Sequence, residues 1–348
     1  METTTLKEQY TALLASQPGL RIRNAADILG VSEAELLATA TQGKVTRLVP
    51  DFPGILGKIE TLGYVMALTR NNEVVHERKG VYLNPSFGPH ASLFVGEDID
   101  LRMFLNQWAF AFAVEEETRG KVRQSLQFFG ADGLAMHKIY LTDQSNQDAF
   151  NELVGAFLYP DQESALNISP SPEEAVELPD SEIDVIGFRN AWIALKDTHD
   201  FFGLLRKFQV SRTQALRLAP EGEYAVEVDL VAVRKVLQAA AETDTPIMVF
   251  VGNRGMIQIH TGTVHKLFEH GEWYNVMDPA FNLHIHEPGI TSAWIVRKPT
   301  EDGMVTSLEC FNASGELVVT FFGKRKPGIP ELEEWRKIVA DIENEFSK

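Results

Sequence analysis

Residues 65–71 read Val-Met-Ala-Leu-Thr-Arg-Asn, and 182 positions later residues 247–253 read Ile-Met-Val-Phe-Val-Gly-Asn. The same offset aligns identical residues elsewhere in the chain: Gly80 with Gly262, Leu101 with Leu283, Ser125 with Ser307 and Gly133 with Gly315. Nearer the start of the chain the offset is 179. Self-similarity held at one spacing over this much sequence is the signature of an internal repeat. The sequence therefore predicts a tandem duplication.

The predicted repeats, residues 1–160 and 183–348, are joined by a segment of different composition, residues 161–182. This segment contains three prolines and several acidic residues but few large apolar side chains. Such a composition is typical of a linker. We therefore expect two repeats joined by a Pro/acid-rich connection.

Each predicted repeat opens with helices and continues with strands. Ser32 followed by Glu35 fits a capping box at the start of a helix. Strands separated by short Asn- and Gly-containing turns are typical of hairpins. Helices are predicted over residues 24–40, 53–62, 148–158, 230–242 and 330–346, and hairpins over residues 248–260 and 307–322. Runs of hairpins favour an α+β fold, with an antiparallel sheet and flanking helices in each repeat.

Composition excludes several classes of protein. The chain has 348 residues, and its 49 acidic against 32 basic side chains give a net charge of −17, so nucleic-acid binding is not expected. One cysteine, Cys310, excludes an intramolecular disulfide and Cys-rich metal sites. No apolar run approaches the ~20 residues of a membrane helix, and the first residues are unlike a signal peptide. We expect a cytoplasmic protein that does not insert into membranes.

His199 is the clearest position at which the two copies differ, because its counterpart is Leu20. It lies beside Phe201 in an apolar stretch, where a neutral imidazole is a good iron ligand. Asp197 and Asp200 are candidates to fix its tautomer, or are solvated acids at a helix end. The alternative for His199 itself is a structural histidine near an apolar helix.

Arg102 is the second such position, because its counterpart is His284. One interpretation is an ion pair with Asp98 or Asp100. The other is a cation that projects into a cleft and hydrogen-bonds a bound anion or oxygen ligand.

Cations of the C-terminal repeat form a third group. Arg212 aligns with Glu33 of the first copy, and an arginine at a helix start can bind a carboxylate through two hydrogen bonds. Arg297, Lys298 and residues 324–326 follow apolar strands. These cations are either an anion-receiving rim or solvated surface charges.

Other polar motifs are weaker. His284 and His286 share one face of a predicted strand, but no motif supplies the third ligand that a metal site needs. Cys310 lies in an apolar strand and is expected in the core. Nucleotide-binding, esterase and metalloprotease motifs are absent from the sequence.

Five motifs in order, residues 98–102, 197–202, 210–212, 249–255 and 322–328, resemble those of the HemS/ChuS/PhuS family of bacterial cytoplasmic haem-utilisation proteins. The resemblance spans nearly the whole chain, including the duplication. It implies two stacked repeats with a haem cleft between them, haem lying against the C-terminal half.

The same resemblance implies the roles of individual residues. His199 would be the axial iron ligand, and Arg102 would approach from the distal side as the catalytic cation. The remaining haem-binding residues would be three propionate partners and two pocket walls: Arg212, Lys298 and Arg325, then Phe104 and Phe250. The first alternatives to His199 as iron ligand are His76, His90 and His137.

The resemblance leaves two activities open. Some family members degrade haem b oxidatively with an external electron donor and O2 or peroxide, releasing iron. Others carry or store haem and pass it to a separate haem oxygenase after uptake through an inner-membrane importer. No Cys-x-x-Cys-His motif is present, so any haem would be held non-covalently.

Overall fold

The computed structural model describes residues 4–40, 44–118, 120–171, 176–326 and 328–348. Residues 172–175 of the predicted linker and residue 327 of the last motif lie outside the described residues.

The chain divides into two compact units, each of which includes a short segment of the other predicted repeat. Unit 1 comprises Met1–Thr69, Glu77–Pro172 and Asn253–Gln258, and unit 2 comprises Arg70–His76, Glu173–Gly252 and Ile259–Lys348. Asn253–Gln258 thus packs with unit 1, where the Asn253 side chain donates to the Met136 carbonyl at 2.9 Å. In unit 2, the Asn71 side chain donates in the same way to the Val318 carbonyl at 2.8 Å. The repeat limits 1–160 and 183–348 stay a prediction.

The strands form two large antiparallel sheets, and one strand order recurs in both units. In unit 1 the hydrogen-bonded order is β1 (Val45–Leu48), β7 (Trp108–Thr118), β8 (Lys121–Gly130), β9 (Ala135–Ser145), β2 (Gly63–Arg70). In unit 2 it is β10 (Ala225–Val228), β16 (Ser292–Thr300), β17 (Gly303–Phe311), β18 (Leu317–Gly323), β11 (Ile247–Asn253). A second run has the order β6 (Asp100–Met103), β5 (Ser92–Val95), β4 (Pro85–Phe87) in unit 1 and β15 (Phe281–His286), β14 (Trp273–Met277), β13 (Leu267–His270) in unit 2. Strands β3 (Val74–Gly80) and β12 (Met256–Gly262) are divided between the units.

Strand pairing repeats at the offset seen in the sequence. Val114 pairs with Ser125 in unit 1, and Val296 pairs with Ser307 in unit 2. The pairing register is therefore conserved between the copies, which confirms the predicted duplication and the α+β class.

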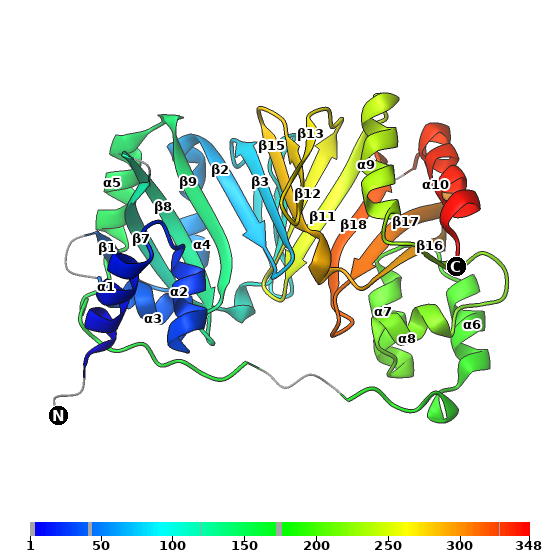
Figure 1. Ribbon diagram of the computed structural model, residues 1–348, viewed down its shortest axis with the longest axis horizontal. Helices are drawn as coiled ribbons and strands as arrows, with labels where there is room; N and C mark the ends of the chain where they lie inside the picture. The colour runs from blue at the N-terminus through cyan, green and yellow to red at the C-terminus, as the bar shows by residue number, and fades with distance from the viewer. Residues whose placement is uncertain (1–3, 41–43, 119, 172–175, 327) are drawn as a thin grey trace. The chain divides into compact units, whose positions relative to one another are not determined.

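Helices cover both faces of the run from β1 to β2 in unit 1 and of the run from β10 to β11 in unit 2 (Figure 1). Those of unit 1 are α1 (Leu6–Ser16), α2 (Ile22–Leu29), α3 (Glu33–Ala38), α4 (Phe52–Leu56), η1 (Ile59–Leu62), η2 (Leu105–Gln107) and α5 (Gln147–Ala156). Those of unit 2 are η3 (Asp180–Glu182), α6 (Val185–Ile193), α7 (Asp200–Phe208), α8 (Arg212–Arg217), α9 (Ala232–Glu242), η4 (Glu287–Gly289) and α10 (Glu333–Phe346). In unit 2, α9 and α10 pack on one face of the strands, and α6 to α8 pack on the other.

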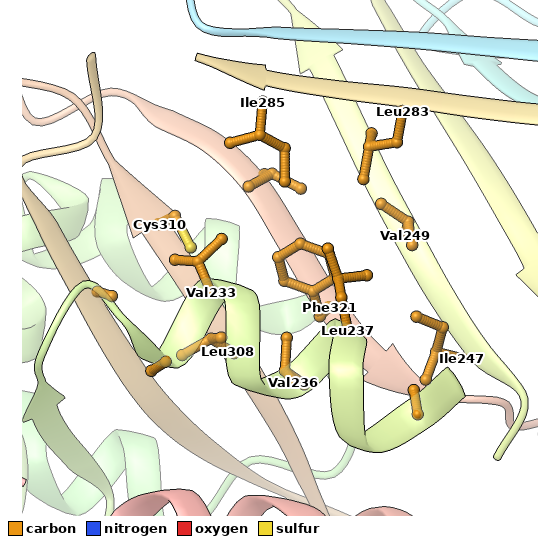
Figure 2. Close-up of a cluster of buried hydrophobic side chains, with 14 of the residues drawn as sticks. Val233, Val236, Leu237, Ile247, Val249, Leu283, Ile285, Leu308, Cys310 and Phe321 are labelled. Atoms are coloured by element: carbon orange, nitrogen blue, oxygen red, sulfur yellow. The ribbon is translucent and has the colours of Figure 1, made fainter. Parts of the chain in front are cut away.

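The largest apolar core of unit 2 lies under α9 (Figure 2). Val233, Val236 and Leu237 share one helix face, because they are three and four residues apart. They pack with buried strand residues that include Phe321 and Cys310. Cys310 is fully buried, and burial raises the pKa of its thiol, so the predicted core position is confirmed.

Two predicted helices are interrupted. The helix expected over 24–40 is α2 followed by α3, because Gly30 adopts a left-handed φ of +68° and ends α2. The predicted capping box, in which Ser32 and Glu35 bond reciprocally, then starts α3. The helix expected over 53–62 ends at Leu56 and resumes as the short η1, since Gly57 follows directly and glycine is a poor helix former.

None of the helices in the described ranges is long and apolar enough to cross a membrane. The longest of them, α10, has 14 residues.

Candidate functional site

His199 lies at the start of α7 with its imidazole directed to solvent. Its Nδ1 is 2.7 Å from Oδ1 of Asp197, and its backbone N–H donates to the same oxygen at 2.9 Å. These hydrogen bonds, the backbone one foremost, lower the pKa of Asp197. A carboxylate only accepts hydrogen bonds, so Nδ1 carries a proton, and in the neutral form of the ring Nε2 is the nitrogen with the lone pair. With 88% of the side chain exposed, His199 offers Nε2 to a ligand outside the unit.

Arg325 lies near the same carboxylate. Its positive charge contributes to lowering the pKa of Asp197, and its Nη2 is 3.8 Å from Oδ2 of Asp302. The Nε of Arg325 is buried and makes no hydrogen bond within the part of the chain that the structure describes. Unit 2 therefore brings together two predicted residues, His199 and Arg325, around Asp197.

Arg212 and Lys298 meet at a third charged residue, Glu309. Nε and Nη2 of Arg212 donate to the two oxygens of Glu309 at 2.8 Å each, and Nζ of Lys298 donates to Oε1 at 2.6 Å. The side chain of Glu309 is fully buried, whereas 26% of the Arg212 side chain is exposed. The predicted two-point contact of Arg212 with a carboxylate is present, and here the carboxylate belongs to this chain.

The charges of this cluster shift the pKa values of Glu309 and Lys298. Burial alone would raise the pKa of Glu309, but the charges of Arg212 and Lys298 hold it well below its ordinary value. Burial lowers the pKa of Lys298 to about 8, with Glu309 opposing that shift. Lys298 is only 3% exposed, so the interpretation of this lysine as a solvated surface charge is wrong.

The cluster contacts the helix that carries His199. Nζ of Lys298 lies 4.7 Å, and Cζ of Arg212 5.4 Å, from the ring centroid of Phe201. Phe201 is in the first turn of α7, two residues after His199, and is itself buried. The ring connects the cations to the start of α7.

The remaining predicted residues lie elsewhere. Phe250 is on β11, half-buried, with its ring 5.1 Å from that of Phe322. In unit 1, Arg102 forms an ion pair with Asp100, as one of its two interpretations predicted. Phe104 follows β6 and donates its backbone N–H to the Gly255 carbonyl at 3.0 Å.

The other histidines differ from His199. His137 is buried, with Nδ1 2.9 Å from Thr69 Oγ1 and Nε2 2.6 Å from the Tyr82 hydroxyl, so both ring nitrogens are occupied. His76 is buried as well, and His90 is exposed.

The histidine pair on β15 has separate partners. Nδ1 of His284 is 2.7 Å from Asn275 Oδ1, and Nε2 of His286 is 3.3 Å from Glu272 Oε2. No group of three metal-ligating side chains occurs among the described residues.

Glu309 was missed by the sequence analysis. Two signals were present: a charged residue stands between Leu308 and Cys310 in a strand of apolar residues, and its counterpart at the 182 offset is the uncharged Gln127. Acidic residues differ between the copies as basic residues and histidines do, and this difference at the 182 offset identifies Glu309.

Comparisons with known proteins agree with this architecture. The haemin-degrading HemS.ChuX domain matches residues 30–157 and 209–342. The hemin transport protein HmuS of Yersinia pestis is 41% identical over 98% of both chains. The solved structure of holo-PhuS, a heme-binding protein from Pseudomonas aeruginosa, covers 97% of this chain and 98% of its own at 45% identity with a TM-score of 0.94. ChuS, an E. coli heme oxygenase, covers 96% of this chain and 99% of its own at 36% identity with a TM-score of 0.87. The chain therefore belongs to the HemS/ChuS/PhuS family.

Proposed function

We propose that this protein binds haem as its cargo or substrate, with Nε2 of His199 as the axial iron ligand. The observation that carries the proposal is the state of that imidazole. Asp197 fixes the tautomer of the neutral ring, in which Nε2 has the lone pair, and 88% of the side chain is exposed. A neutral imidazole oriented by a carboxylate is a common iron ligand in proteins.

The charges of unit 2 support haem rather than a neutral ligand. Haem is an apolar disc with two carboxylates on one edge. Arg325, near Asp197, and the exposed part of Arg212 are cations that can receive those carboxylates. Lys298 binds the same carboxylate, Glu309, as Arg212, and Phe250 offers an aromatic surface. The assignments of Arg102 and Phe104 in unit 1 stay predictions.

We further propose that bound haem is degraded oxidatively, with an external electron donor and O2 or peroxide, to release iron. Support comes from its relative ChuS, described as a heme oxygenase. The second candidate is a haem carrier that receives haem from an importer and passes it to a separate oxygenase. Relatives named hemin transport proteins favour this second candidate.

A haem titration of two histidine variants tests the iron ligand. We expect the wild-type protein to form a one-to-one complex with a shifted Soret band. His199→Ala should change that band and weaken haem retention by about tenfold or more, since one ligand bond to iron is lost. His90→Ala, which removes an exposed histidine, is the matched control and should resemble the wild type. If His90→Ala moves the band and His199→Ala does not, the assignment fails.

Product analysis separates enzyme from carrier. With reductant, O2 and catalase present, an enzyme converts its Soret band into a defined tetrapyrrole product and free iron. A carrier keeps its Soret band under these conditions and transfers haem rapidly to apo-myoglobin in a stopped-flow experiment.

A further inference from the structure

Glu309 is a fully buried carboxylate on β17 to which the proposed function gives no role. It accepts two hydrogen bonds from Arg212 and one each from Lys298 and Ser307, the last at 3.1 Å. A buried carboxylate with this many donors has a fixed position and fixes its partners in turn.

The contact with Arg212 uses one particular edge of the guanidinium. Nε and Nη2 face Glu309, so the edge formed by Nη1 and the second Nη2 hydrogen points away from it. A guanidinium has five N–H donors in a rigid plane, and two of its edges can each donate a pair of hydrogen bonds to a carboxylate. Within the described residues, Nε and Nη2 of Arg212 donate hydrogen bonds and Nη1 does not, and 26% of the side chain is exposed.

We propose that Glu309 is a positioning residue: it holds Arg212 by one edge so that the opposite edge is presented to a carboxylate of the bound ligand. This inference rests on the proposed function and adds to it a specific determinant of ligand choice. The ligand class it selects is a carboxylate-bearing tetrapyrrole, in preference to the same ring with esterified side chains.

The position of Arg212 is defined relative to the iron ligand. Arg212 and Lys298 both lie over the Phe201 ring, and Phe201 is two residues from His199 on the same helical turn. Glu309 therefore links the carboxylate-binding edge of Arg212 to the helix that carries the imidazole. A tetrapyrrole ring is rigid and its propionate arms are short, so the separation between its centre and its carboxylates varies only within narrow limits, and recognition of both ends needs such a link.

Charge alone makes the opposite prediction for a Glu309 variant. Removing the Glu309 charge makes the cluster more positive, so a purely electrostatic site would bind an anionic ligand more tightly. A positioned Arg212 loses its support instead, and the preference for a carboxylate falls.

The test compares protoporphyrin IX with its dimethyl ester, both without iron, by fluorescence quenching. The readout is the ratio of the two dissociation constants, which iron ligation does not affect. In the wild type we expect the free acid to bind about tenfold more tightly than the ester, the size of one charge-assisted contact. Glu309→Gln should lower this ratio to about two or less, with a melting temperature measured alongside to confirm folding.

Three further variants complete the experiment. Glu287→Gln, the matched control, weakens a like two-bond contact of an arginine, Arg234, outside this cluster and should keep the ratio near the wild-type value. Glu309→Asp, which retains the charge but withdraws the carboxylate by one methylene, should lower the ratio even if Glu309→Gln does not fold. Arg212→Lys should lower it as well, because an ammonium lacks the planar edge.

An unchanged or larger ratio in Glu309→Gln or Glu309→Asp overturns the positioning role. If that ratio is unchanged but the wild type binds haem one to one, only the positioning role fails, and the proposed function stands. If the wild type binds neither haem nor protoporphyrin stoichiometrically, the proposed function fails and the positioning role fails with it.

Discussion

Equivalent helix-start positions of the two units carry opposite charges. Glu33 is the first residue of α3 and Arg212 the first residue of α8, each preceded by a capping serine. Glu33 forms a buried ion pair with Lys138 of β9, whereas Arg212 binds Glu309 of β17. The acid is on the helix in unit 1 and on the strand in unit 2.

The strand positions extend this reversal. At the 182 offset, Lys298 replaces Glu116 and Glu309 replaces Gln127, whose amide is 3.4 Å from Glu116. In unit 1 the group consists of two acids, Glu33 and Glu116, and one cation, Lys138, so its net charge is −1. In unit 2 the group consists of two cations, Arg212 and Lys298, and one acid, Glu309, so its net charge is +1. The same scaffold thus holds a net positive group of charges in unit 2 and a net negative group in unit 1.

Breaking the unit 1 pair should give the largest change in stability. Lys138→Met leaves Glu33, whose side chain is 6% exposed, without this partner and removes the cation on which the charge of Glu116 also acts. We expect the free energy of unfolding to fall by about 3 to 5 kcal/mol in urea denaturation. Lys298→Met should lower it by only about 1 kcal/mol, because Glu309 keeps both hydrogen bonds from Arg212.

The double variant Glu33→Leu with Lys138→Met is the control for an unpaired charge. It should recover most of the stability lost in Lys138→Met, since no buried ion remains. Equal losses in the single and double variants would show that packing, and not the unpaired carboxylate, determines the effect.

A second difference between the units concerns a neutral polar network. Thr69, Tyr82 and His137 of unit 1 are hydrogen-bonded to one another through the imidazole. The residues at the 182 offset, positions 251, 264 and 319, are all valines buried in the core of unit 2. Unit 1 therefore contains a buried titratable ring where unit 2 contains only hydrocarbon.

This network should make unit 1 sensitive to acid. Burial lowers the pKa of His137 to about 3, from 6.5 when unfolded. Between these values the unfolded chain binds a proton that the folded chain does not, so stability is lost as the pH falls from 6.5 towards 3. The slope is about 1.4 kcal/mol per pH unit.

The test is the variant His137→Gln, whose side chain does not titrate. It should reduce the slope of the free energy of unfolding against pH by the contribution of one proton, about 1.4 kcal/mol per pH unit, and His90→Gln should not. An unchanged slope in His137→Gln would contradict the buried, neutral state of His137.

The duplication and much of its register could be predicted from the sequence, because alignments such as Ser125 with Ser307 hold wherever strands pair alike in both copies. The start of α3 was predictable as well, since the capping box at Ser32 is a local signal. The exchange of Asn253–Gln258 into unit 1 was not, because local sequence does not specify which repeat a strand contacts. The partner of Arg212 was missed for the same reason: Glu309 is 97 residues away in the chain.

Arg102 should show the smallest effect on stability and a separate effect on function. It is a half-exposed residue paired with Asp100, and its counterpart at the 182 offset is His284, bonded to the neutral Asn275. Exposed pairs contribute little, so Arg102→Ala should change the free energy of unfolding by about 0.5 kcal/mol or less.

Haem should still bind to Arg102→Ala with the Soret shift of the His199 complex. Oxidative breakdown with reductant and O2 should slow, if Arg102 is the distal cation that the family resemblance implies. Arg78→Ala, which removes the pair with Asp98 and one positive charge, is the matched control for the loss of charge. Loss of haem from Arg102→Ala, or equal slowing in Arg78→Ala, would remove Arg102 from the catalytic role and leave His199 as the residue on which haem handling depends.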